Sequence, residues 1–187
     1  HPFHTLHVEN THRRYPHATL YGTVRHRKRF PDMPWAELET DDAALHQLFG
    51  DDLEFSVPRG VDFISANENV HFSSVLALHR ASRTIHVDDT LMYVTLPKVA
   101  RLFGHADLMS FHPTLAKALE KRARASADFR DWAEELAARW RDARNLCAAH
   151  TAALTAERNR GASIHARILQ ALDKVGRTLA AHERKYG

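Results

Sequence analysis

Residues 71–94 read His71-Phe-Ser-Ser-Val-Leu-Ala-Leu-His-Arg-Ala-Ser-Arg-Thr-Ile-His-Val-Asp-Asp-Thr-Leu-Met-Tyr-Val94. An apolar run precedes the polar residues Arg80–Arg83, and the β-branched run Thr84–Val87 follows them, which is typical of a β-hairpin. If the turn centres between Ala81 and Ser82, the numbers of paired residues sum to roughly 163. The hairpin therefore brings the two ends of this stretch together.

This register gathers reactive side chains at the open end of the hairpin. Ser74 is expected opposite Asp89, and His71 is expected at the same end. His86 alternates to the opposite face of its strand, so we interpret it as structural. An imidazole and the carboxylates of Asp88 and Asp89 can converge there on a cation, which would offset the cost of burying the carboxylates.

The composition predicts one folded unit with an unusual number of metal-ligating side chains. The chain has 187 residues, 44% hydrophobic and 26% charged, enough for one core of the α/β or α+β class. Fifteen histidines exceed ordinary usage, and neutral imidazole is the commonest protein ligand for transition metals. The single cysteine, Cys147, excludes an internal disulfide framework and fits a cytoplasmic protein. No stretch is apolar enough for a membrane span, so no membrane association is expected.

The first third of the chain is predicted to consist of short elements separated by turns. They are a strand at Ala18–Gly22, a polar surface loop at Arg25–Pro34, a helix at Asp41–Phe49 ended by Gly50, and strands at Leu53–Val57 and Val61–Ser65.

The remainder is predicted to be mainly helical after Leu96-Pro97. The expected elements are a helix from Pro113 with Leu115, Leu119 and Ala123 on one face, a helix capped near Ser126, a buried strand at Asn145–Ala149 that ends at His150, and a long helix from about Ala153 to the end. The last helix has an apolar stripe from Ile164 to Leu179 and a charged face. That helix can pack on the core or serve a homo-oligomer.

Five short motifs follow one another in a recognisable order. They are His1-Pro-Phe-His4, Tyr15-Pro-His-Ala-Thr-Leu-Tyr-Gly22, His71-Phe-Ser-Ser-Val75, Val87-Asp-Asp-Thr90 and Leu146-Cys-Ala-Ala-His150. This order resembles the metallo-β-lactamase superfamily, in which an H-x-H-x-D-H loop precedes a lone histidine, an aspartate turn and a last histidine. The resemblance covers about residues 1 to 151 and implies an α/β fold, the αββα sandwich, of which this chain is the later part. It implies a domain at 1–152 and, at 153–187, a C-terminal amphipathic helix packed on that domain.

The resemblance also implies the ligands of a metal site. Matched position by position, they are His1, His4, His71, Asp89 and His150, and Asp89 is also the implied catalytic residue. Zinc, as one or two ions, suits such donors, and iron or manganese also fits. Two residues depart from the family pattern, because Phe3 stands at the place of the motif aspartate and Asp88 at that of the usual turn glycine.

The function implied by the resemblance is metal-dependent hydrolysis of a small-molecule ester, amide, thioester or phosphodiester by metal-bound water. Phe3 cannot bind a cation, so a degenerate scaffold that has lost catalysis is an alternative. His7 and His12 are alternative ligands in the first loop, although a solvated surface position suits them better.

A different class of function is nucleic-acid binding. Arg25-His-Arg-Lys-Arg29 is followed by Phe30, and Arg13-Arg14-Tyr15 lies nearby, so basic and aromatic residues are interleaved as in a phosphate-contacting loop. The formal net charge is only +3, with 26 basic against 23 acidic residues. A solvated loop is therefore the simpler interpretation of these residues.

Overall fold

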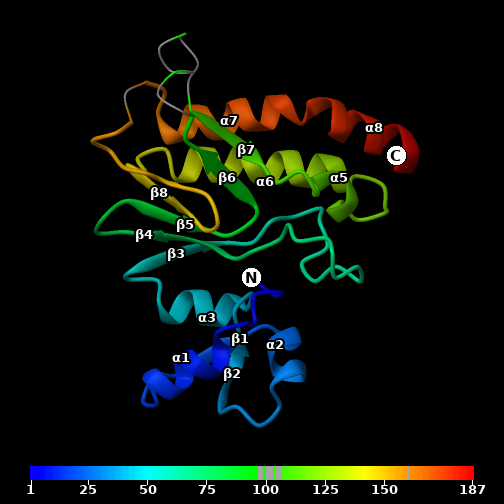
Figure 1. Ribbon diagram of the computed structural model, residues 1–187. Coiled ribbons are helices and arrows are strands. Elements are labelled where there is room, and N and C mark those ends of the chain that lie inside the picture. Colours follow the sequence, from blue (N-terminus) through cyan, green and yellow to red (C-terminus); the bar gives the residue numbers. More distant parts are fainter. Residues whose placement is uncertain (97–98, 100–102, 104–106, 160) are drawn as a thin grey trace.

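A central five-stranded sheet organises the mixed α/β fold of this chain (Figure 1). The computed structural model describes residues 1–96, 99, 103, 107–159 and 161–187. The sheet has the strand order β3 (Leu53–Ser56), β4 (Leu76–His79), β5 (Thr84–Val87), β8 (Asn145–Ala148) and β9 (Ala153–Leu154). Only β5 and β8 are parallel neighbours in it. The predicted strands at 53–57 and 145–149 are thereby confirmed.

The central hairpin has the predicted register. Its pairs are Ala77↔His86, Leu78↔Ile85 and His79↔Thr84. Leu78 and Ile85 are buried, while His86 on the other face is exposed, as expected for a structural residue. The alternation of apolar and polar side chains sets this register, because a slip by one residue would turn the apolar set toward solvent.

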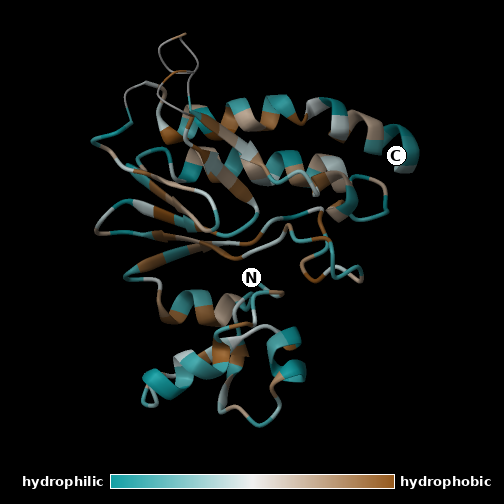
Figure 2. Cartoon of the chain, viewed as in Figure 1, coloured by the Kyte–Doolittle hydropathy of each residue, from teal (hydrophilic) through white to brown (hydrophobic). Residues whose placement is uncertain are grey.

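Three helices cover one side of the sheet (Figure 1). They are α6 (Ala125–Arg139), α7 (Ile164–Lys174) and α8 (Gly176–Tyr186). The predicted stripe of α6 is buried in the core, and its Trp132 indole N–H donates to Ser56 Oγ of β3 at 2.9 Å. Hydrophobic residues accordingly gather between these helices and the strands (Figure 2). Each large apolar side chain buried there contributes about 1.5–3 kcal/mol.

A smaller antiparallel pair, β6 (Leu91–Val94) with β7 (Leu108–Phe111), packs against α7. The sequence patterns did not predict β7, since the chain was expected to be helical beyond Pro97. The start of that predicted helical part lies outside the described residues.

The N-terminal elements lie on the far side of β3 from α6 and α7 (Figure 1). They are α1 (Val8–Arg14), β1 (Leu20–Gly22), α2 (Val24–Arg29), β2 (Trp35–Glu39) and α3 (Ala43–Leu48). Strands β1 and β2 form a parallel pair, and α3 confirms the predicted helix before Gly50. In α1 no residue is buried, and both α1 and α2 are mainly hydrophilic (Figure 2).

The surface loop predicted at 25–34 is wrong, because its first half is the helix α2. Thr23 caps this helix, since its side chain accepts from the backbone N–H of His26 and the His26 ring accepts from the Thr23 N–H. A capping box usually has Glu or Gln in place of His26, so the pattern was not recognised. Strand β2 also went unpredicted.

Two more predictions fail around Gly60. The strand predicted at 61–65 is absent from the described structure, where Val61 makes only an isolated bridge to Leu119. The helix from Pro113 is reduced to α5 (Leu115–Ala118), because the backbone N–H of Glu120, two residues beyond its end, bonds to Gly60 O at 3.1 Å.

The predicted cap at Ser126 is also wrong. Helix α6 begins one residue earlier, at Ala125, behind Arg124, which has a left-handed backbone with φ 66°. Ser126 is buried inside the helix. The helix start depends on how Arg124 turns the chain, which the side-chain pattern does not reveal.

The long helix predicted from Ala153 starts later and is divided. Ala153 and Leu154 form β9, Ser163 caps α7 with its side chain, and a break at Val175 separates α7 from α8. The predicted apolar stripe is nevertheless buried at Ile164 and Leu179. Among the described residues, no helix is both long and apolar enough to cross a lipid bilayer.

A matched pair of glycine substitutions tests the packing of the 60–62 segment on α6. Gly60 has φ +72°, and a Cβ there would lie 2.0 Å from Ala125 O, so Gly60→Ala is expected to lower the free energy of unfolding by at least about 2 kcal/mol. Gly176→Ala has no atom within 4 Å of the new Cβ and is expected to stabilise the protein by about 0.5–1 kcal/mol. Urea unfolding measures both, and equal effects would contradict this packing.

Candidate metal centre

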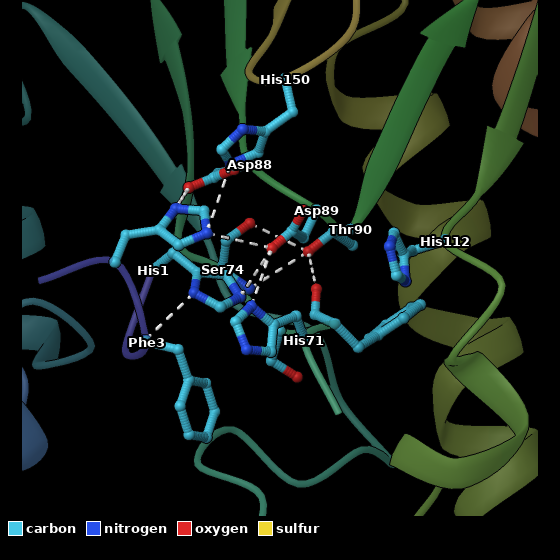
Figure 3. A network of polar contacts seen from close by, with 12 residues as sticks. His1, Phe3, His71, Ser74, Asp88, Asp89, Thr90, His112 and His150 are labelled. Carbon is cyan, nitrogen blue, oxygen red and sulfur yellow. Dashed lines mark hydrogen bonds and ion pairs between the residues drawn. The ribbon is translucent and has the colours of Figure 1, made fainter. Parts of the chain in front are cut away.

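The structure brings the five predicted ligands together at the end of β5 (Figure 3). They come from four distant stretches of the chain. His1 and His4 belong to the N-terminal loop, His71 precedes β4, Asp89 lies between β5 and β6, and His150 follows β8. The structure shows that these side chains converge. That they bind a metal stays a prediction.

One carboxylate oxygen is the common neighbour of three imidazoles. Asp89 Oδ2 lies 3.3 Å from His1 Nε2, 3.3 Å from His4 Nε2 and 3.8 Å from His71 Nδ1. These four side chains form one group whose donor atoms all lie within 4.8 Å of one another. A single cation at the centre of such a group can contact each donor after small side-chain adjustments.

A second group overlaps the first and includes Asp88. His4 Nδ1 pairs with Asp88 Oδ2, while Asp88 Oδ1 lies 3.3 Å from His150 Nε2. His150 Nε2 is also 3.3 Å from His4 Nε2. The described residues thus offer two overlapping donor sets, which share His4 and Asp89.

Asp88 was expected at this end of the hairpin, but it was not among the ligands that the resemblance implied. Neighbouring residues of a regular strand point to opposite faces, which argues against two adjacent carboxylates in one site. Asp89, however, has a left-handed backbone with φ 54°, and Thr90 N–H donates to Asp88 O at 2.6 Å. This tight bend ends the alternation and turns both carboxylates toward the imidazoles. The resemblance implied a turn at Val87–Thr90, but it did not imply that Asp89 has a left-handed backbone.

Two residues of the site have left-handed backbones. Asp89 and His150 have φ 54° and 66°, and among the described residues other than glycine only Arg83 and Arg124 also have positive φ. Such conformations cost about 1–3 kcal/mol each and are found most often at functional sites.

The donors include buried atoms without a hydrogen-bond partner. Within the described structure, these atoms are His1 Nε2, Asp88 Oδ1 and Asp89 Oδ2. The His1 side chain is fully buried and that of Asp89 is 11% exposed. Burying a carboxylate that is unpaired costs several kcal/mol, and neutral imidazoles do not cancel its charge. A divalent cation fits these residues, and mixed imidazole and carboxylate donors suit zinc, iron or manganese.

His71 is oriented by contacts on its far side. Its Nε2 donates to the backbone oxygen of Glu68 at 2.8 Å, which leaves the lone pair of Nδ1 directed toward Asp89. Metal-ligating histidines are commonly oriented in this way by a backbone carbonyl. The His71 ring also stacks on the Phe3 ring, with centroids 5.0 Å apart. The Arg25 guanidinium lies over the Phe3 ring as well, 4.5 Å from its centroid. Arg25 in turn pairs with the Glu68 carboxylate at 2.8 Å.

Phe3 therefore has a structural role that the sequence analysis did not foresee. Its ring contacts both the Arg25 guanidinium and the His71 imidazole, and it cannot be a ligand. Its backbone N–H donates to His1 Nδ1 at 3.1 Å, which turns His1 Nε2 toward Asp89. In a neutral ring this contact places the proton on Nε2, so ligation through Nε2 would require the proton to move and the contact to open.

His26 positions His4 from behind. Its Nδ1 accepts from Thr23 N–H, and its Nε2 donates to the backbone oxygen of His4 at 3.2 Å. Burial lowers the pKa of His26, which favours the neutral ring needed for this pair of bonds. The site thus depends on the cap of α2, which sequence reasoning treated as a loop.

Buried hydroxyls hold the two sides of the site together. Thr90 Oγ1 donates to Phe72 O at 2.8 Å and accepts from Ser74 N–H, so the bend is tied to the chain that carries His71. Thr114 Oγ1 donates to His71 O at 2.6 Å. Ser74 was expected at the open end of the hairpin together with the Asp88-Asp89 pair. Its backbone N–H bonds there to Oγ1 of the next residue, Thr90.

The other sequence candidates lie elsewhere. His7 and His12 belong to neither donor group of the described structure. In the basic segment, Arg25 is paired with Glu68, and Arg27 donates to Glu37 O at 2.7 Å. Comparison with family models, with curated proteins and with solved structures found no match for this chain. Donor geometry and chemistry therefore carry the assignment of this site.

The positioning role of His26 can be tested without a metal. His26→Leu removes both ring bonds and is expected to lower the free energy of unfolding by about 1–3 kcal/mol and to shift the imidazole NMR signals of His4. His46→Leu is the control, because His46 also donates from Nε2 to a backbone oxygen, that of Thr40, at 2.9 Å but lies outside the donor groups. Unchanged His4 signals in His26→Leu would show that His26 does not hold the site.

Proposed function

We propose that this chain is a metal-dependent hydrolase with a His/Asp metal centre. The observation that carries the proposal is the buried Asp89 Oδ2, which has no hydrogen-bond partner in the described structure and faces nitrogens of His1, His4 and His71. The unpartnered Oδ1 of Asp88 beside His150 adds a further donor set. A site for one zinc ion is the simplest form, and two zinc ions, iron or manganese are further forms of the same proposal.

The proposed fold assignment is the αββα sandwich of the metallo-β-lactamase superfamily, in its later part. Two features support it: the order of the histidine and aspartate motifs along the chain, and the cover of helices on one side of the sheet with the donors at strand ends. The proposed division is a domain at 1–152 and a helical C-terminal segment at 153–187 packed on it.

The chemistry of a bound cation would be to acidify a water molecule and polarise the scissile ester, amide, thioester or phosphodiester bond. Asp89 would bind the cation through Oδ2, and Asp88 would orient His4 through the contact at Nδ1. The His150 side chain is 59% exposed, so it lies on the side from which a small-molecule substrate can approach. We also propose a cytoplasmic location, since the lone Cys147 suits a reducing compartment.

Metal content is the first test. Protein purified without added metal is expected to contain close to one equivalent of a transition metal. Asp89→Asn and His71→Ala are expected to lower its affinity at least about 100-fold, because each removes a donor from the shared group. His86→Ala is the control, since His86 is exposed on β5 outside the donor groups. Metal-free wild-type protein that binds no added zinc would contradict the proposal.

Activity is the second test. In a screen of esters, lactones, thioesters and phosphodiesters, at least one class is expected to be hydrolysed, with loss of turnover after chelation and recovery with zinc. Asp89→Asn is expected to reduce kcat/KM by about 10³-fold or more, because the shared carboxylate holds the cation. A metal-loaded protein inactive on every class would favour the degenerate scaffold instead.

A further inference from the structure

A large cavity adjoins the candidate metal centre. Its volume is about 840 Å³, within the range of roughly 300–1,000 Å³ typical of small-molecule sites. His4 and His150 line the cavity and also belong to the second donor group, so the two sites share a wall. The remaining lining comes from the N-terminal loop, α1, β1, α2 and β2.

The cavity has an aromatic lining. Phe3, Tyr21, Phe30 and Trp35 contribute rings, and Leu6 and Val8 add aliphatic surface. Four histidines and two threonines also line the cavity, and its aromatic and aliphatic surface favours the apolar part of a ligand. Glu9 and Arg29, the only fully charged side chains among its lining residues in the described structure, have opposite signs. The lining therefore has no net formal charge that would select an ionic group.

Part of the wall is held rigidly. The Trp35 indole N–H donates to Phe30 O at 2.8 Å, which fixes the ring plane. Gly22 leaves room for this ring, since a Cβ there would lie 2.9 Å from Trp35 Cζ3. A preformed aromatic surface loses little entropy when a ligand binds.

Another part of the lining is apolar surface that the fold leaves exposed. Leu6, just before α1, is 85% exposed, and α1 adds the apolar Val8 beside the polar Glu9 and Thr11. A ligand in the cavity would remove this apolar surface from water at a gain of roughly 25 cal/mol per Å² of area. In the free protein this surface stays in contact with water, so folding does not provide this free energy.

We infer that this cavity binds the uncharged alkyl or aryl part of the substrate, so that its scissile bond lies next to His4 and His150. The inference rests on the proposed hydrolase function and specifies its substrate class, which is esters, thioesters or amides with a hydrophobic acyl or aryl group. The juxtaposition of an aromatic cavity with the donor group carries it.

Dye binding tests the cavity separately from the metal. The probe is N-phenyl-1-naphthylamine, an uncharged apolar fluorophore, added to chelator-treated protein. Wild type is expected to bind it with micromolar affinity and a rise in fluorescence. Leu6→Asp places a charge on the wall and is expected to weaken binding by about tenfold or more. Phe30→Ser, which keeps the backbone oxygen that Trp35 uses, is a second variant with the same expected effect.

Leu48→Asp is the matched control. Leu48 is likewise exposed, at 60%, but does not line the cavity, so its variant is expected to bind the dye as wild type does. Circular dichroism verifies that each variant is folded. No dye binding by wild type, or equal weakening in Leu6→Asp and Leu48→Asp, would overturn the inference.

A series of p-nitrophenyl esters tests the link to catalysis. For metal-loaded wild type, kcat/KM is expected to rise about fourfold per added acyl methylene until the cavity is filled, and Leu6→Asp is expected to flatten this dependence. Leu48→Asp should keep it. A flat dependence in an active wild type would overturn the inference, whereas dye binding by a metal-loaded protein that hydrolyses no ester, amide, thioester or phosphodiester would overturn the proposed function alone.

Discussion

The arrangement of this site depends on the bend at Asp88–Asp89, between β5 and β6. A regular strand would send the two carboxylates to opposite faces, but the left-handed backbone of Asp89 turns both toward the histidines. Thr90 anchors the bend, because its buried hydroxyl bonds to Phe72 O and to Ser74 N–H. The hairpin register sets where His71 lies relative to this bend, and burial of apolar side chains sets that register. The packing of the core therefore determines the geometry of the donors.

The bend has an electrostatic cost that the described contacts do not fully offset. Within the described structure, Asp88 and Asp89 each present a carboxylate oxygen that is buried and without a hydrogen bond. Protonated imidazoles or a bound cation can supply the missing positive charge. The contact behind His71 favours the cation, because its Nε2 donates to Glu68 O and its Nδ1 faces Asp89, whereas the Phe3 N–H contact at His1 Nδ1 favours a proton on the Nε2 of His1.

Residues far from the donors complete the site, and they explain where sequence reasoning stops. Phe3 was interpreted as a lost ligand, yet its ring packs against both Arg25 and His71. His26 was placed in a loop, yet it caps α2 and holds the backbone of His4. Both roles depend on contacts between segments separated by about 20 residues or more, and side-chain type alone does not predict such contacts.

The sequence by itself determined the hairpin at 76–87 with its register, the buried stripe of α6 and the stretches that would supply histidines and Asp89. Hydrophobic periodicity determines the hairpin and the stripe, because each strand or helix must bury its apolar side, whereas the ligand stretches were implied by the resemblance of the motif order. Only the tertiary structure decided that Asp88 joins the site, that residues 25–29 are helical and that an aromatic cavity adjoins His4. These features arise from a backbone bend, a side-chain cap and packing between distant segments, none of which has a periodic pattern in the sequence.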